Sequence, residues 1–142
     1  MAEPYPIYLD ALREGKFPDK ISRARELLSN CRVCPRQCGV NRFEGALGEC
    51  RSGYEPIISS YFPHFAEEAP LVGRNGSGTI FIGGCNLLCL FCQNYDTSHL
   101  LSGREVSIQH FADLMLKLQQ TGCHNINIVT PSHIVPQLIE AL

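Results

Sequence analysis

Three closely spaced cysteines near the middle of the sequence constrain this chain more than any other feature. They are Cys85, Cys89 and Cys92, with three and then two residues between them. The apolar run 79–82 comes just before them and predicts a short strand, and the glycine pair 83–84 lets the backbone turn sharply after it. Three thiolates at this spacing can hold one face of a cubic iron–sulfur cluster, which normally takes four cysteine ligands. Because the next cysteine, Cys123, is far off in the sequence, the fourth iron is expected to lack a protein ligand and to be open to chemistry.

The motif resembles the signature of the radical S-adenosylmethionine superfamily, which is three cysteines spaced CxxxCxxC with an aromatic residue before the last. Phe91 fills that aromatic place. The wider runs 76–81, 84–87 and 91–95 resemble one branch of the superfamily, the proteins related to pyruvate formate-lyase activating enzymes. The resemblance extends over nearly all of the chain.

This resemblance implies a concrete chemistry. Cys85, Cys89 and Cys92 would hold a [4Fe-4S] cluster, whose unique iron would bind the amino and carboxylate groups of S-adenosylmethionine. One electron from the reduced cluster would cleave the sulfonium bond and give methionine and a 5′-deoxyadenosyl radical, which would abstract a hydrogen atom from a substrate. Phe91 would lie near the adenine. The cofactor carries the chemistry and the protein supplies binding and orientation, so no side chain is designated as catalytic.

Two other interpretations of the three cysteines are available. They could form a zinc site completed by a distant residue, or they could be small buried hydrophobic residues. Zinc sites usually pair their cysteines as two CxxC-like knuckles, whereas this group has one spacing of three. Thiolates in a loop flanked by glycines also suit a metal better than packing. The cluster is therefore the preferred interpretation.

Length and composition favour one globular domain in a reducing compartment. The chain has 142 residues, of which 44% are hydrophobic and 18% charged, and this excludes a disordered class. The net charge of -2 gives no reason to expect nucleic acid as a partner. No apolar run has the length of a membrane span, and the N-terminus lacks the pattern of a secretory signal. Eight cysteines without such a signal indicate metal or cluster ligation in the cytoplasm, not disulfides.

Residues 1–29 are predicted to form an N-terminal helical segment. Its residues 5–29 read as helical, and Pro18 with Asp19 offers a turn and a helix start. Apolar residues recur on one helical face at Ile21, Ala24, Leu27 and Leu28. We expect this segment to serve packing, and we assign it no chemistry.

Residues 30–56 form a second cysteine group. Its members are Cys31, Cys34, Cys38 and Cys50, separated by two, three and eleven residues. Proline and glycine interrupt the segment, so it can bury little apolar surface, and a metal ion or cluster would supply the missing stabilisation. Four cysteines suit a structural zinc or a [4Fe-4S] cluster equally; free or disulfide-bonded cysteines are the alternative. The group resembles an N-terminal cysteine module of the same branch, which does not decide the metal. A cluster would relay electrons, whereas zinc would hold the segment together.

Residues 57–142 are predicted to form an α/β core. The run 57–62 indicates a short strand. Ser107 is typical of a helix N-cap, and the helix after it reaches about residue 120, with a buried stripe of Ile108, Phe111, Met115 and Leu118. The run 125–129 indicates a second strand parallel to 79–82. Family resemblance implies that this βαβ unit begins a partial (βα) barrel of the radical S-adenosylmethionine type, of which the chain has room for about two βα units.

The two predicted parallel strands should bring their following loops side by side, because binding groups gather where such strands end. Cys85 follows the first strand, and residues 130–133 follow the second. Many family members have Gly-Gly-Glu at the second place, where it holds the methionine end of the cofactor, but this chain has Thr-Pro-Ser-His. A branch with a Thr-Pro-His type of loop is similar, so Thr130 and Ser132 are candidates for cofactor contact. His133 is a candidate too, although a lone histidine at a helix start is more often structural.

Several further residues have both a functional and a structural interpretation. His64, Glu67 and Glu68 would either line the approach to the cluster or form a solvated loop. Asn94 and Tyr95 would contact the substrate or cofactor, or make ordinary loop hydrogen bonds. Met115 and Cys123 are expected in the core.

The length of the chain leads to two functional hypotheses. A complete eight-unit barrel takes ~200 residues or more, and this sequence stops inside an apparent helix, so we expect the N-terminal portion of a longer protein, from a truncated gene, a split protein or a fragment. The first hypothesis is a radical S-adenosylmethionine oxidoreductase that needs flavodoxin or ferredoxin as reductant. Its substrate is unknown; the resemblance implies a glycine in a partner enzyme as one target. The alternative is an iron–sulfur or zinc module that binds or transfers electrons without catalysis of its own.

Overall fold

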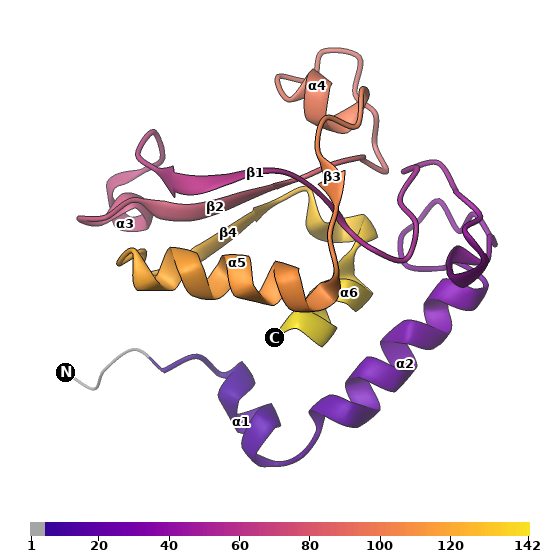
Figure 1. Ribbon diagram of the computed structural model, residues 1–142, viewed down its shortest axis with the longest axis horizontal. Helices are drawn as coiled ribbons and strands as arrows, with labels where there is room; N and C mark the ends of the chain where they lie inside the picture. Colours follow the sequence, from indigo (N-terminus) through magenta and orange to yellow (C-terminus); the bar gives the residue numbers. More distant parts are fainter. Residues whose placement is uncertain (1–4) are drawn as a thin grey trace.

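A four-stranded open sheet forms the centre of the protein in the computed structural model, which describes residues 5–142 (Figure 1). The strands are β1 (Ile57–His64), β2 (Ser77–Ile82), β3 (Arg104–Glu105) and β4 (Ile126–Val129). They lie in the order β3-β1-β2-β4. β1 pairs antiparallel with both β2 and β3, and β2 pairs parallel with β4. The expected α/β class is confirmed.

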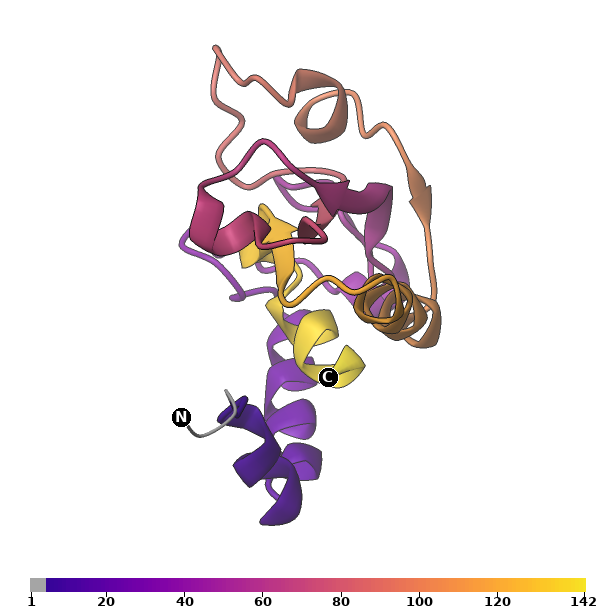
Figure 2. The same ribbon diagram turned by 90° about the vertical axis from the view of Figure 1, so that its left-hand side faces the viewer.

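The parallel pair confirms the predicted βαβ unit. Its crossover contains α5 (Ile108–Gln120), which packs along one face of the sheet (Figures 1 and 2). The Ser107 side chain caps the helix by accepting a hydrogen bond from the backbone N–H of His110 at 3.1 Å. Gly122 follows the helix at φ +95°, a conformation that favours glycine.

The core lies between this face of the sheet and α5. Its buried residues are Ile58, Ile80, Ile82, Val106, Phe111, Leu114, Leu118, Cys123 and Ile134. Phe111 and Leu118 were predicted in the buried stripe of α5, and Met115 packs partly buried against it. The third fully buried position of the helix belongs to Leu114 and not to Ile108.

β1 runs two residues beyond its predicted end and passes through Pro63. β3 pairs only with Ile57 and Ile58, so the later half of β1 has an open edge away from β2. A proline lacks the N–H that a ladder needs, and such an edge is where a strand tolerates it.

The helical N-terminal segment consists of two helices, and the second begins one residue before Pro18, where the sequence predicted a turn and a helix start. α1 (Tyr8–Arg13) and α2 (Phe17–Ser29) are separated at Gly15, whose φ is +67°. α2 packs on α6 (Val135–Ala141) and buries Ala24 and Leu28, while Leu27 is exposed. Both N-terminal helices extend away from the sheet (Figures 1 and 2).

The remaining elements are short. They are α3 (Ala69–Val72), α4 (Tyr95–Ser98) and the 3-10 turns η1 (Arg42–Glu44) and η2 (Pro131–His133). Among residues 5–142, no helix is both long and apolar enough to cross a membrane.

Candidate functional site

The loop that carries Cys85, Cys89 and Cys92 leaves the end of β2 and leads to α4 (Figure 1). Its first turn is made at Gly84, where φ is +80°. A Cβ atom at this position would lie 2.4 Å from the backbone oxygen of Cys50 and 3.1 Å from Ser52 Oγ. The close approach fits only glycine, and it places the two cysteine groups next to each other.

Two of the three thiols in this loop accept hydrogen bonds. The backbone N–H of Leu87 donates to Cys85 Sγ at 3.3 Å, and the Ser98 hydroxyl donates to Cys92 Sγ at 3.3 Å. Cys85 is buried, Cys92 is half-buried and Cys89 is exposed. Hydrogen bonds to ligating sulfur tune the potential of iron–sulfur clusters. The loop therefore has the donor chemistry that a cluster needs.

Ser98 connects Cys92 to an aromatic pair. Its hydroxyl oxygen lies 2.7 Å from His99 Nδ1, and the His99 ring stacks on Tyr95 with ring centres 4.3 Å apart. When the hydroxyl donates to sulfur, its oxygen accepts from the Nδ1–H of His99. Tyr95 thus supports the loop. Sequence reasoning missed Ser98, because a serine six residues after the motif has no diagnostic spacing.

Arg36 joins the second cysteine group to this loop. Its Nε–H donates to the Asn86 backbone oxygen at 2.8 Å, and Nη2 lies 3.5 Å from the Leu87 oxygen. Charge-assisted bonds to two successive carbonyls fix the backbone just after Cys85. No sequence pattern indicates this contact, which spans fifty residues.

The loops after β2 and β4 lie side by side, as the sequence predicted. Thr130 Oγ1 donates to the Val129 oxygen at 2.7 Å and lies 3.5 Å from the Ile82 oxygen. Thr130 has φ +59°, a strained conformation for a β-branched residue. Its hydroxyl is already engaged, whereas Ser132 is exposed.

His133 is almost completely buried, with 1% of its surface exposed. Its burial, aided by the positive charge of Arg42, lowers its pKa to about 4, although the hydrogen bond with Gly83 acts in the opposite direction. The ring is therefore neutral near pH 7. Nε2 lies 3.3 Å from the Gly83 oxygen and must carry the proton to donate there. Nδ1 consequently keeps a lone pair, and it has no hydrogen-bond partner among the described residues.

Arg42 is a buried cation that links the second cysteine group to η2. Its Nε and Nη2 donate to the Gly53 oxygen at 2.9 and 2.6 Å, and Nη1 donates to the His133 oxygen at 2.7 Å. These carbonyls compensate the buried guanidinium, which would otherwise be costly. Arg42 therefore positions the loop that holds His133, and no sequence pattern indicates this role.

The second cysteine group surrounds one small cavity. It is lined by Cys31, Cys34, Cys38 and Cys50, together with residues that include Arg36, Arg42 and His133. All eight cysteines of the chain lie in the described region and are free thiols. In that region no three His, Cys, Asp or Glu side chains are arranged to hold a metal ion as they stand. Both cysteine groups thus supply suitable donors, and binding would require thiol side chains to turn.

No family model matches the chain. It is similar to two proteins of Methanocaldococcus jannaschii, both described as uncharacterized. The identity with MJ0674 is 43% over 92 residues, which cover 65% of this chain and 26% of that protein. The identity with MJ0808 is 25% over 134 residues, which cover 78% of this chain and 37% of that protein. The chain thus spans between about a quarter and two fifths of these relatives, and no solved structure matches it.

The apolar side chains of the three-cysteine loop project into solvent. Leu90 is 95% exposed and Phe91 is 93% exposed. The aromatic residue expected near the adenine is thus exposed to solvent.

His64 and Glu67 lie at the opposite end of the sheet from the cysteines. Their side chains are 3.9 Å apart, and His64 pairs with Ser77 at the start of β2. The cysteine loop leaves the other end of β2, and a strand of this length spans about 17 Å. Of the two interpretations of this polar group, the solvated loop fits its position.

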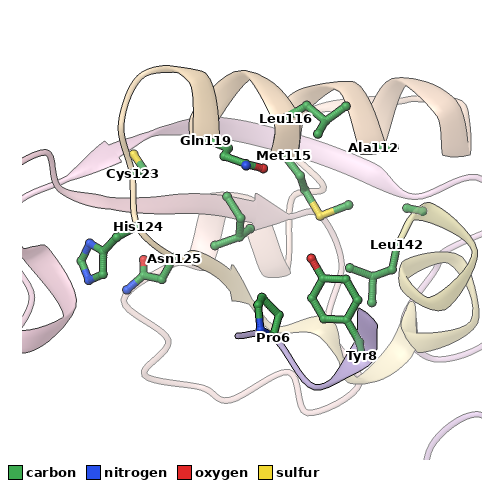
Figure 3. A pocket seen from close by; sticks show the side chains of 12 residues that line it. Pro6, Tyr8, Ala112, Met115, Leu116, Gln119, Cys123, His124, Asn125 and Leu142 are labelled. Atoms are coloured by element: carbon green, nitrogen blue, oxygen red, sulfur yellow. The ribbon is translucent and has the colours of Figure 1, made fainter. Parts of the chain in front are cut away.

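A cavity of about 630 Å³ lies between α5, β4 and the two ends of the described chain (Figure 3). Tyr8, Met115 and Leu142 surround it, and its lining, as described, contains no acidic side chain, lysine or arginine. None of the seven clustered cysteines borders it. We therefore place the candidate chemistry at the cysteine loop and not in this larger space.

Proposed function

We propose that this chain is the cluster-bearing part of a radical S-adenosylmethionine enzyme related to pyruvate formate-lyase activating enzymes. Cys85, Cys89 and Cys92 would hold a [4Fe-4S] cluster. The observation that supports this best is the position of the CxxxCxxC loop, which leaves β2 beside the loop that follows its parallel partner β4. The carboxyl ends of parallel strands are where α/β proteins bind ligands and place reactive groups.

The chain's own residues have defined roles in this proposal. Leu87 N–H and the Ser98 hydroxyl hold the sulfur atoms of Cys85 and Cys92, and Arg36 fixes the backbone between them. When bound, a reduced cluster of this kind supplies one electron to S-adenosylmethionine, whose cleavage yields a radical that abstracts hydrogen. Phe91 is free to cover the adenine, and the 130–133 loop stands next to the site.

The same proposal covers the barrel, the N-terminal segments, the reductant and the substrate of the whole protein. β2 and β4 would be the first strands of a partial barrel, residues 30–56 a metal-binding module, and residues 1–29 a packing segment. The reductant would be flavodoxin or ferredoxin in the cytoplasm. A protein glycine is the substrate that the resemblance favours. Because the chain spans only part of its relatives, these assignments concern the whole protein.

Electron paramagnetic resonance tests the proposal directly. Protein reconstituted with iron and sulfide under anaerobic conditions and then reduced should give a [4Fe-4S]⁺ signal that shifts when S-adenosylmethionine is added. Cys89→Ala should lose this signal, because it removes one of three ligands. Cys123→Ala, which removes a buried thiol outside both groups, should keep it. A signal that persists in Cys89→Ala would place the cluster elsewhere.

A metal-binding or electron-transfer module without catalysis is the second candidate. Both cysteine groups supply thiol donors for a metal, and this candidate requires nothing beyond them. In that case the cluster signal would form normally and would not change with S-adenosylmethionine.

A further inference from the structure

The cavity of the second cysteine group has room for a single ion. Its volume is about 10 Å³, and a space of about 10–15 Å³ accommodates one water-sized sphere. The four iron and four sulfide atoms of a cubic cluster need much more. With the thiols as they stand, the size of this cavity favours a single metal ion over a cluster.

The backbone around the cavity keeps the cysteines together. Cys31 N–H donates to the Val40 oxygen at 2.9 Å, and Gly39 N–H donates back to the Cys31 oxygen at 3.1 Å. The Glu49 N–H lies 3.4 Å from Cys38 Sγ and donates to it. A Cβ at Gly48 would lie 2.8 Å from that sulfur. The segment that leads to Cys50 therefore packs closely against Cys38.

The cavity wall carries positive charge. Arg36 and Arg42 both line it. A divalent cation with four thiolates has a net charge of -2, and two guanidinium groups contribute +2. Opposite charges nearby favour the deprotonated thiolates that a metal requires.

His133 gives an independent sign of a polar occupant. It lines the same cavity, it is 1% exposed, and its Nδ1 has no partner in the described part of the chain. A buried polar atom without a partner destabilises the fold, because it has lost its hydrogen bonds to water. A polar or charged occupant of the cavity would reduce this destabilisation.

We propose that this cavity holds one Zn²⁺ ion, coordinated by the thiolates of Cys31, Cys34, Cys38 and Cys50. The site would be closed and structural, because Cys31 and Cys50 are buried and four thiolates complete a tetrahedral shell. It would stabilise a segment whose regular structure is confined to η1 in the described chain. Through Arg36 it would also brace the loop of the first cysteine group.

Metal analysis of the whole chain tests this proposal. Protein purified without oxygen should contain about one zinc per chain, and X-ray absorption at the zinc edge should show sulfur ligands at about 2.3 Å. Cys34→Ser should lower zinc affinity by on the order of 100-fold or more, since even residues outside the ligand shell cost 10–100-fold. Cys123→Ser is the matched control and should keep its zinc. A zinc shell of oxygen ligands, or a chain that binds no zinc, would overturn the proposal.

Two variants separate this site from the proposed cluster. Cys89→Ala should lose iron and keep zinc, whereas Cys34→Ser should lose zinc and still bind iron. Zinc that disappears with Cys89→Ala would belong to the first group and would refute the assignment. If Cys34→Ser fails to fold, the absorption spectrum of the unaltered chain still decides the metal and its ligands. Retention of zinc in His133→Gln would support four thiolate ligands, and its loss with the fold intact would refute that set.

Discussion

Arg36 belongs to one cysteine group and holds the backbone of the other, so its loss should act at a distance. Arg36→Gln removes charge-assisted bonds to the Asn86 and Leu87 oxygens. We expect amide hydrogen exchange in residues 86–90 to accelerate several-fold, while global stability falls by only about 1 kcal/mol because the side chain is exposed. Arg23→Gln, an exposed change on α2, should leave exchange in this loop unaltered. Equal exchange in both variants would show that Arg36 does not position the loop.

Arg42 should be far more costly to replace. Arg42→Met keeps much of the apolar stem but leaves the Gly53 and His133 oxygens without their donors in the interior. Each buried group left unpaired costs about 1–3 kcal/mol, so the free energy of unfolding should fall by about 2–5 kcal/mol in urea denaturation. Arg23→Met, at an exposed position, should change it by about 0.5 kcal/mol or less.

Sequence spacing identified the cysteines but could not find the residues that hold them. Arg36 and Arg42 donate to backbone oxygens 50 and 91 residues away, and any residue type at those positions offers the same carbonyl. Ser98 reaches Cys92 only because α4 folds back on the loop. Such contacts are fixed by tertiary packing, so a single sequence carries no pattern for them.

The turn between β2 and the cysteine loop depends on Gly84. Gly84→Ala would combine an unfavourable φ of +80° with a Cβ contact of 2.4 Å to the Cys50 oxygen. Gly15→Ala is a matched control, since its φ is +67° but no described atom lies within 4 Å of the added Cβ. We expect Gly15→Ala to cost about 1 kcal/mol and Gly84→Ala about 1–3 kcal/mol more, measured by thermal unfolding. Equal losses of stability in the two variants would mean that the backbone near Gly84 can move to accommodate the added methyl group.

α5 offers a second matched pair. Leu114 is 5% exposed in the core, whereas Leu116 on the same helix is 53% exposed. Leu114→Ala should destabilise the protein by about 2–5 kcal/mol, and Leu116→Ala by about 0.5 kcal/mol or less. Chemical denaturation of both variants checks this difference, and comparable losses would contradict the packing of the helix.

The elements themselves were largely predictable, because hydrophobic periodicity is a local signal. The βαβ unit, the Ser107 cap and the side-by-side loops all followed from it. The end of β1 was not predictable, since Pro63 is tolerated only where β3 stops. In the N-terminal segment, the helix start at Pro18 was predictable, whereas the break at Gly15 and the separate helix α1 were not.

Within residues 5–142, contacts of different kinds join the segment of the second cysteine group to the loop of the first. Arg36 donates to the cysteine loop, Arg51 donates to the His99 oxygen, and Gly84 packs against the Cys50 oxygen. The 30–56 segment therefore supports the loop after β2 through these contacts.

This coupling predicts that removing zinc from the second group disturbs the first. Chelation of the wild-type protein, followed by amide hydrogen exchange, should accelerate exchange in residues 31–50 and also in 85–103, although no thiol of the latter loop binds zinc in our proposal. Exchange within α5 should stay unchanged, because its core contacts do not involve the cysteines of either group. Acceleration confined to 31–50 would mean that the contacts of Arg36 and Gly84 transmit no stability. Acceleration in both segments would show that a structural metal orders the loop on which the proposed cluster depends.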